Sequence, residues 1–140
     1  MSKRTVTALV LLLVGFPTLI FGGIPYLLFM GFFIAASSWE YAELFRAAGS
    51  RPARWLVLAG VIAIIVSRYF FPAASLPILT FSVMILMAHH LLDYERGAEH
   101  AGLDFSVSLG ALMYVGWVGA YLLEIRQLVN GGWWIMFVLP

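Results

Sequence analysis

The sequence predicts an all-α fold, a polytopic transmembrane helical bundle with five complete spans and the start of a sixth. Hydrophobic residues make up 63% of the 140 residues and charged residues only 11%, whereas a soluble domain carries about 25% charged residues. Mean hydropathy is +0.97. Long apolar runs alternate with short segments rich in glycine, proline or charge. Such a chain cannot cover its surface with water-facing side chains, so we expect it to lie in a bilayer.

The first apolar run is long enough for two helices. It holds 35 consecutive uncharged residues, 5–39, whereas one span needs only about 20. Gly22-Gly23 followed by Pro25 predicts the turn between the helices, because glycine permits unusual backbone angles and proline suits a helix start. We therefore expect helices at residues 6–21 and 26–47.

The basic start Lys3-Arg4 before an apolar run is also how a signal peptide opens. Cleavage would require small residues at defined positions, and the run continues through Pro17 to the glycine pair without such a site. The sequence therefore predicts a retained first helix, with Pro17 as a candidate kink.

Three further apolar runs predict helices at residues 55–71, 76–92 and 103–125. A basic loop at 50–54 separates the first of them from the preceding helix, and a turn containing proline lies at 71–75. The strongly polar segment 93–102 precedes the last helix of the three. These breaks complete the predicted set of five spans.

A sixth apolar segment, 133–140, follows the Gly131-Gly132 turn. Its eight residues would extend about 12 Å as a helix, against a hydrocarbon core of about 30 Å. The segment either lies in the interface or begins a span that the natural chain completes beyond Pro140. Unpaired backbone groups are costly in lipid, which favours the second alternative.

The distribution of lysine and arginine predicts a cytoplasmic N-terminus. With five spans, six of the eight basic residues fall on the cytoplasmic side and two on the opposite side, as the positive-inside rule requires. The six are Lys3, Arg4, Arg46, Arg51, Arg54 and Arg96, and the two are Arg68 and Arg126. Losing or merging one helix would remove this bias.

Histidines near the end of the fourth predicted helix are the first candidate site. His89 and Asp93 are four residues apart and share a helix face, and with His100 they could form a metal site. The side chains of neighbours such as His89 and His90 leave a helix about 100° apart around its axis, so we expect these two not to share an ion. A helix end where these groups meet water is the simpler interpretation, and we predict no metal here.

Charged residues at other predicted helix ends form the second group of candidates. Glu43 and Arg46 are three residues apart and can pair, while Trp39 and Tyr41 suit the membrane interface. We interpret this stretch as an interfacial helix end.

At the opposite side we expect Arg68 to reach outward to water. Glu124 and Arg126 are interpreted there as interfacial anchors. The last long helix carries the pairs Ser106–Gly110 and Gly116–Ala120, whose spacing of small residues favours close helix packing. The helix interiors otherwise hold little beyond serine and threonine.

Several classes of function are disfavoured by composition. The chain has no cysteine, which excludes disulfides, thiol catalysis and cysteine-bound zinc, and its net charge of +1 gives no case for a nucleic-acid partner. Phosphate-binding glycine loops, serine-hydrolase elbows and zinc-protease motifs are absent from the sequence. The acids are also too scattered to predict a metal site for nucleotide chemistry.

Three stretches together resemble one family of membrane enzymes. They are the run Tyr114-Val115-Gly116-Trp117 through Leu122-Leu123 and Arg126 to Gly131-Gly132-Trp133, the run Trp39-Glu40-Tyr41 to Leu44, and the opening Lys3-Arg4-Thr5-Val6. They are similar to the Y-x-G-x-x-x-x-Y/H-L-x-x-L/I-R and W-E-x-x-x-L patterns and to the usual start of bacterial phosphatidate cytidylyltransferases, also called CDP-diacylglycerol synthases. The resemblance covers nearly all 140 residues, as the amino-terminal portion of that family.

The resemblance implies a multi-pass enzyme of the bacterial inner membrane that condenses phosphatidate with CTP, giving CDP-diacylglycerol and pyrophosphate. The family's acidic helix and its Ser-Pro-x-K-T signature are not in this chain. We therefore expect a membrane scaffold that is inactive alone, contacts phosphatidate and other lipids, and meets CTP only through the missing half. Mg²⁺ is expected for the full-length enzyme and none for this chain, and a homodimer is a further expectation.

No catalytic residue is transferred from the resemblance. Six positions match the family pattern without an assigned role: Trp39, Glu40, Tyr114, Gly116, Trp117 and Arg126. The alternatives are a small membrane transporter subunit, a non-enzymatic membrane assembly protein and a relative of the polyprenol or dolichol kinases. Charges confined to predicted helix ends argue against the transporter.

Overall fold

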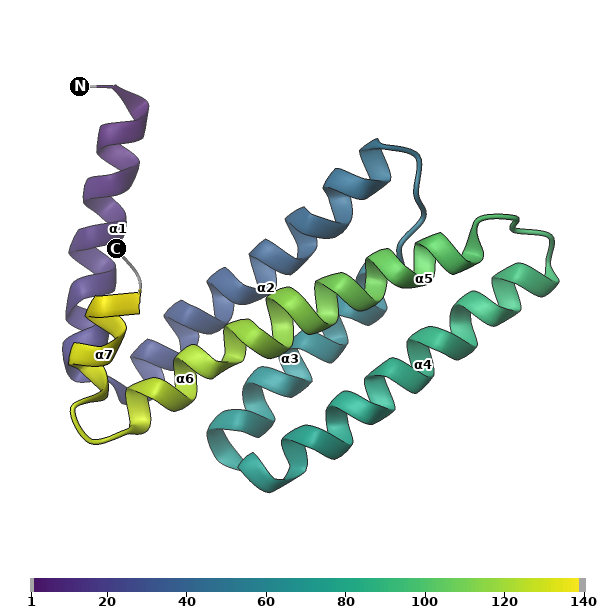
Figure 1. The fold of residues 1–140 in the computed structure, drawn as a ribbon. Coiled ribbons are helices and arrows are strands. Elements are labelled where there is room, and N and C mark those ends of the chain that lie inside the picture. Colours follow the sequence, from purple (N-terminus) through teal and green to yellow (C-terminus); the bar gives the residue numbers. More distant parts are fainter. Residues whose placement is uncertain (1, 139–140) are drawn as a thin grey trace.

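The computed structural model describes residues 2–138, and all regular secondary structure in that range is helical (Figure 1). The helices are α1 (Lys3–Phe21), α2 (Gly23–Ala47), α3 (Arg54–Phe70), η1 (Pro72–Ala74), α4 (Ser75–Glu95), α5 (Ala101–Gly110), η2 (Ala111–Val118), α6 (Gly119–Gln127) and α7 (Gly131–Val138). Each predicted helical range overlaps the observed helices, and the range 103–125 covers parts of α5 and α6 and all of η2. The predicted segment 133–140 corresponds to α7, except that Leu139 and Pro140 lie outside the described residues.

The all-helical, membrane-type prediction is confirmed, whereas the count of spans is only partly supported. Three stretches of the described chain are long and apolar enough to cross a membrane: Lys3–Phe21, Pro72–Glu95 and Ala101–Gln127. Helix α3 has 17 residues, which extend about 25 Å, less than the hydrocarbon core of about 30 Å. Helix α2 becomes polar in its second half. The five-span count therefore stays a prediction.

Helices α2, α3 and α4 pack beside a long rod made of α5, η2 and α6, which follow one another without a break (Figure 1). Helix α3 contacts α2, α4 and all three parts of the rod. Its Val57, Val61 and Ile64 are buried in the core. Leu112 and Leu123 of the rod belong to the same core cluster. Helix α3 therefore lies at the centre of the bundle.

Small residues allow the rod and α3 to approach closely. A Cβ atom at Gly116 would lie 2.7 Å from Cγ2 of Val61, and one at Gly60 would lie 2.9 Å from Cδ1 of Leu112. Ala120 is fully buried. The predicted packing role of Gly116 and Ala120 is confirmed. Ser106, in contrast, is exposed and takes no part in such packing.

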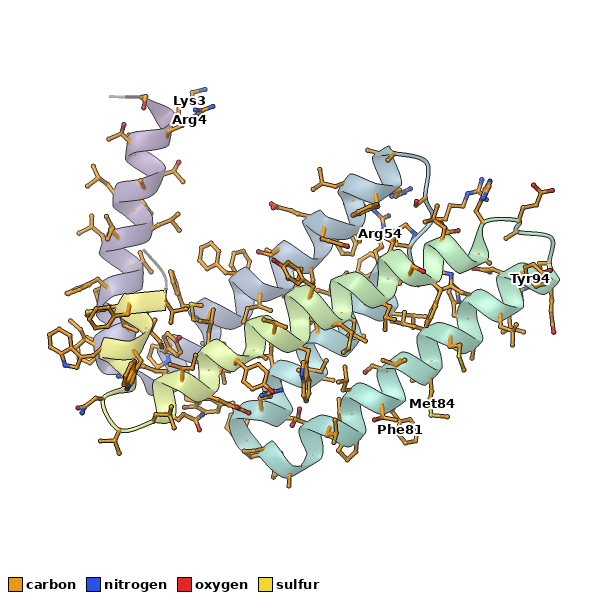
Figure 2. The ribbon with its side chains drawn as sticks, viewed as in Figure 1. Lys3, Arg4, Arg54, Phe81, Met84 and Tyr94 are labelled. Carbon is orange, nitrogen blue, oxygen red and sulfur yellow. The ribbon has the colours of Figure 1, made fainter. Side chains whose placement is uncertain are left out.

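Side chains on the outside of the bundle are largely apolar. Phe81 and Met84 point outward from α4 (Figure 2), with 69% and 56% of their surface exposed. Soluble monomers rarely show extended apolar patches, whereas lipid tails solvate such side chains well. The outer surface thus agrees with the hydropathy of the sequence.

Helix α1 stands at an angle to the bundle, next to α7 (Figure 1), and none of its residues is buried. The helix runs through Pro17 to Phe21 without a break. Gly22 and Gly23 then turn the chain with φ of 62° and 60°, values that glycine adopts without strain. The predicted glycine turn is therefore confirmed.

A single arginine fastens the end of α1 to the rod. The Nε and Nη2 atoms of Arg126 donate to the carbonyl oxygens of Leu19 at 2.8 Å and Ile20 at 3.1 Å. These carbonyls belong to the last turn of α1, where helical partners are lacking and a positive charge is favoured. The hydrogen bonds of Arg126 therefore join two helix ends, and its interpretation as an interfacial anchor stays a prediction.

Candidate functional site

The strongest concentration of charge lines a pocket at one end of the bundle, near Arg54 in Figure 2. The pocket has a volume of about 430 Å³ and lies where the chain passes from α2 into α3. It is lined by Arg46, Arg51, Pro52, Ala53, Arg54, Trp55, Leu56 and His89. We call this the basic pocket. Three of its eight lining residues are arginines, so it is suited to an anion.

Two of the arginines are held by one carboxylate of α2. Glu43 accepts a short hydrogen bond from Nη1 of Arg54, and its Oε1 lies 3.5 Å from Nη1 of Arg46. The Glu43–Arg46 pair predicted from the spacing is thus confirmed. The hydrogen bond from Arg54 holds the pKa of the exposed Glu43 carboxyl, beyond the apolar part of α2, below its usual range. Glu43 therefore pairs with two of the three arginines that line the pocket, and no side-chain partner is seen for the guanidinium of Arg51 among the described residues.

Aromatic side chains form the outer edge of the basic pocket. The guanidinium carbon of Arg54 lies 4.8 Å from the centre of the Trp39 ring, close enough for a cation–π interaction. The Trp39 and Trp55 rings meet edge to face with centroids 4.8 Å apart. Trp55 remains 68% exposed. An amphipathic ring beside a basic cluster is typical of the membrane interface.

A buried polar network fixes the wall of the pocket to α5. The backbone nitrogens of Arg51 and Ala53 donate to Oδ1 of Asp104 at 2.7 Å and to Oγ of Ser108 at 3.0 Å. Ser108 Oγ also donates to the Asp104 carbonyl at 2.9 Å and lies 3.0 Å from Nε2 of His90. The loop that carries the arginines is therefore tied to the interior.

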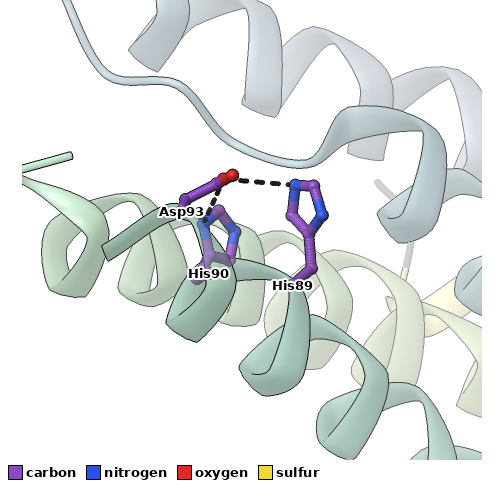
Figure 3. A group of neighbouring side chains, drawn as sticks. All are labelled: His89, His90 and Asp93. Carbon is purple, nitrogen blue, oxygen red and sulfur yellow. Dashed lines mark ion pairs between the residues drawn. The ribbon is translucent and has the colours of Figure 1, made fainter. Parts of the chain in front are cut away.

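The histidines of α4 lie differently from the sequence interpretation. His90 is only 3% exposed, so it does not meet water at a helix end. His89, His90 and Asp93 each present a possible ligand atom, and these atoms lie within 4.8 Å of one another (Figure 3). The angle between neighbouring helix positions does not keep the two rings apart, because both side chains turn toward Asp93. His100, just before α5, is not in this group.

A second polar cluster lies near the other end of the bundle. Arg68 is 2% exposed, and its Nη1 donates to Oε1 of Glu124 at 2.6 Å. Its guanidinium carbon lies 3.8 Å and 3.9 Å from the ring centres of Trp117 and Tyr121. The prediction that Arg68 reaches outward is therefore wrong, since the bundle itself offers a counter-charge and two aromatic faces.

Sequence reasoning missed this cluster, although one signal was present. Trp117, Tyr121 and Glu124 are spaced four and three residues apart, which places them on one face of a helix. Of these three residues only Glu124 is interpreted from the sequence, together with Arg126, as an interfacial anchor. The expectation that helix interiors hold little beyond serine and threonine is wrong for the same reason.

The family-pattern positions divide into two groups. Four of them make the packing contacts described above: Trp39, Gly116, Trp117 and Arg126. The other two, Glu40 and Tyr114, are exposed. Four of the positions that carry the resemblance therefore hold the helices together.

Three carboxylates of the described chain are engaged in hydrogen bonds between different parts of the fold. Glu43, Asp104 and Glu124 each accept a hydrogen bond from another part of the chain. Within residues 2–138, the one group of three possible metal ligands is His89, His90 and Asp93. The described residues therefore do not gather several acids at one point.

Comparison with known proteins identifies the family. The cytidylyltransferase family matches residues 2–140 of the chain. No curated protein and no solved structure matches it. The match spans almost the entire sequence, in agreement with the resemblance found in the tyrosine–glycine and tryptophan–glutamate stretches. The chain therefore belongs to the cytidylyltransferase family.

Proposed function

We propose that the chain forms the lipid-binding membrane part of a phosphatidate cytidylyltransferase, which makes CDP-diacylglycerol and pyrophosphate from CTP and phosphatidate. The family match supports the cytidylyltransferase chemistry. The observation that carries the choice of phosphatidate is the basic pocket, in which three arginines line one hollow at the polar end of an apolar bundle.

Phosphatidate combines a phosphate monoester with two acyl chains, and the basic pocket suits both parts. Guanidinium groups bind phosphate through paired hydrogen bonds, and basic pockets between membrane helices bind lipid headgroups. Leu44 and Trp55 lie near the pocket in the sequence and are 71% and 68% exposed. Apolar side chains at this depth can contact the acyl chains while the arginines hold the phosphate.

The reaction with CTP requires groups of another kind. A triphosphate is handled by metal ions that carboxylates hold, and the carboxylates Glu43, Asp104 and Glu124 are engaged within the fold. We therefore assign CTP and Mg²⁺ to another part of the enzyme and propose that this chain alone is inactive. The proposed setting is a bacterial inner membrane with the N-terminus and the basic pocket at the cytoplasmic side.

The buried Arg68–Glu124 pair is the one observation that favours the transporter alternative, since charges inside a membrane bundle often mark solute paths. Here the guanidinium is paired with Glu124 and stacked against Trp117 and Tyr121. Nε of Arg68 is buried without a hydrogen-bond partner, but the ion pair and the two aromatic contacts favour a packing role over transport, and we retain the enzyme as the proposed function.

Lipid binding by the purified chain in detergent tests the proposal. Titration with short-chain phosphatidate, followed by calorimetry, is expected to show binding about tenfold tighter than with phosphatidylcholine. The Arg46→Gln/Arg51→Gln variant should lose about tenfold in affinity for phosphatidate, because it removes guanidinium groups that donate to the phosphate. Addition of CTP and Mg²⁺ should convert none of the phosphatidate.

Arg96→Gln is the matched control. Arg96 is exposed, follows α4 and does not line the basic pocket. Its substitution removes one positive charge outside the pocket and should leave the affinity unchanged. Equal losses in the two variants, or equal affinity for the two lipids, would contradict the proposed site. Turnover by the chain alone would contradict the proposal that CTP and Mg²⁺ bind to another part of the enzyme.

A further inference from the structure

We propose that His89, His90 and Asp93 bind a divalent metal ion of the zinc type at the end of α4. Figure 3 shows the three side chains facing one another. Oδ2 of Asp93 lies 3.4 Å from Nε2 of His89 and 3.9 Å from Nδ1 of His90. Tetrahedral ligands about 2.1 Å from an ion are about 3.4 Å from each other. Small side-chain rotations therefore close the group around one ion.

The hydrogen bonds of Ser108 determine which nitrogen of His90 is free. A serine hydroxyl has one hydrogen, and Ser108 donates it to the carbonyl of Asp104 at 2.9 Å. The same oxygen accepts from the Ala53 nitrogen at 3.0 Å. Toward Nε2 of His90, also at 3.0 Å, it can only accept. Nε2 therefore carries the hydrogen, and Nδ1 of the neutral ring carries a lone pair.

That lone pair lies in a place where it lacks a hydrogen-bond donor. Nδ1 of His90 is buried and has no hydrogen-bond partner. Its neighbour Asp93 Oδ2, at 3.9 Å, is another acceptor and lies beyond hydrogen-bonding distance. A buried acceptor without a partner is costly, and two acceptors that face each other call for a cation between them. A simple His89–Asp93 ion pair leaves this nitrogen unexplained.

The ligand set points to the class of metal. Two imidazoles and one carboxylate suit Zn²⁺ and similar transition ions, whereas Mg²⁺ prefers oxygen ligands in an octahedron. Histidines that bind metals usually donate their other ring N–H to an oxygen, which fixes the ring. The His90–Ser108 hydrogen bond has this form. The site thus differs in chemistry from the Mg²⁺ expected for the transferase reaction.

The proposed ion would lie beside the basic pocket. His89 is one of the residues that line this pocket. Three protein ligands leave a fourth position, which in zinc sites is taken by water or by a bound anion. An ion held here adds positive charge to the pocket wall. The metal site does not depend on the proposed lipid, so the two can be tested separately.

Metal titration of the purified chain tests this inference. After treatment with a chelator, the chain in detergent is titrated with Co²⁺, whose visible absorption reports tetrahedral coordination, and with Zn²⁺ in competition. We expect one tightly bound Zn²⁺ that Mg²⁺ in excess does not displace. His89→Ala and Asp93→Asn should weaken binding at least about tenfold, and Ser108→Ala, which frees the tautomer of His90, about tenfold.

His100→Ala is the matched control, because it removes a nearby exposed histidine outside the group. It should bind Zn²⁺ like the wild type, and Zn²⁺ should raise the melting temperature of both. Equal binding by the wild type and the His89→Ala/Asp93→Asn variant would overturn the proposal. If a variant fails to fold, the wild type decides, since weak octahedral Co²⁺ absorption alone refutes the site.

Discussion

At the scale of single residues, Arg68 is the most constrained charge in the bundle. Transfer of a guanidinium from water costs several kcal/mol unless partners replace its hydration. Glu124 and the rings of Trp117 and Tyr121 provide partners, while Nε of Arg68 is buried without one. The side chain of Arg68 is 3% exposed and that of Glu124 is 38% exposed. The buried Arg68 therefore needs its counter-charge more than the partly exposed Glu124 does.

This inequality predicts an asymmetric effect of substitution. Glu124→Met leaves a buried, unpaired guanidinium and should destabilise the fold by about 3 kcal/mol. Arg68→Met leaves a carboxylate that can reach polar surroundings and should cost about 1 kcal/mol. The double variant should recover most of the loss, because apolar side chains replace the pair. Unfolding followed by circular dichroism in detergent measures all three.

Glu99→Gln in the polar loop before α5 serves as the control and should change the stability little. A larger loss for Arg68→Met than for Glu124→Met would show that the arginine stabilises the bundle chiefly through its aromatic contacts.

At the scale of elements, the rod of α5, η2 and α6 packs against α3 through glycine. The Cβ position of Gly116 is occupied by Val61, and that of Gly60 by Leu112. The interior has no room for an added methyl group at these points unless neighbouring side chains or the helices move. The close approach of α3 and the rod therefore depends on glycine, which has no side chain, at these two positions.

Substitution of Gly116 tests this dependence. Gly116→Ala should destabilise the bundle by about 1–3 kcal/mol, the usual cost of overpacking. Gly102→Ala in α5 is the control, since nothing lies within 4 Å of its Cβ position. There alanine should stabilise the helix by up to about 1 kcal/mol. Opposite shifts in melting temperature are expected, and a stabilising Gly116→Ala would contradict the contact.

Most helices could be predicted from the sequence because glycine, proline and charge interrupt the apolar runs at their ends. The Glu43–Arg46 pair could be predicted too, because its spacing is local. The pairs Arg54–Glu43, Arg68–Glu124 and Arg126–Leu19 could not, because they join different helices. Hydropathy likewise gives no sign of the π-helical turns of η2, in which the hydrogen bonds change but the composition does not.

At the scale of the whole molecule, the polar segments gather at two ends. Hydrogen bonds from the loop after α2 to α5 join that loop to the end of the bundle where α4 passes into α5. The turns after α3 and α6 lie at the other end (Figure 1). This arrangement agrees with the predicted orientation, in which the two ends face opposite sides of a membrane.

Single cysteines can test the orientation, because the chain has no cysteine of its own. Ser50→Cys and Ala98→Cys should react with a membrane-impermeant thiol reagent only from the cytoplasmic side. Ala73→Cys and Val129→Cys should react only from the opposite side. Labelling of Ser50→Cys and Ala98→Cys from different sides would disprove the five-span arrangement.

The π-helical stretch Ala111–Val118 sets the angular phase of every residue after it. A π-helical turn contains more residues than an α-helical turn, so a deletion of one residue there would restore a regular helix. The residues beyond it would rotate by about 100°. Glu124 and Arg126 would then turn away from Arg68 and Leu19 together. The partner of the buried arginine and the attachment of α1 therefore depend on the same stretch of helix, and an insertion or deletion there should disturb both contacts.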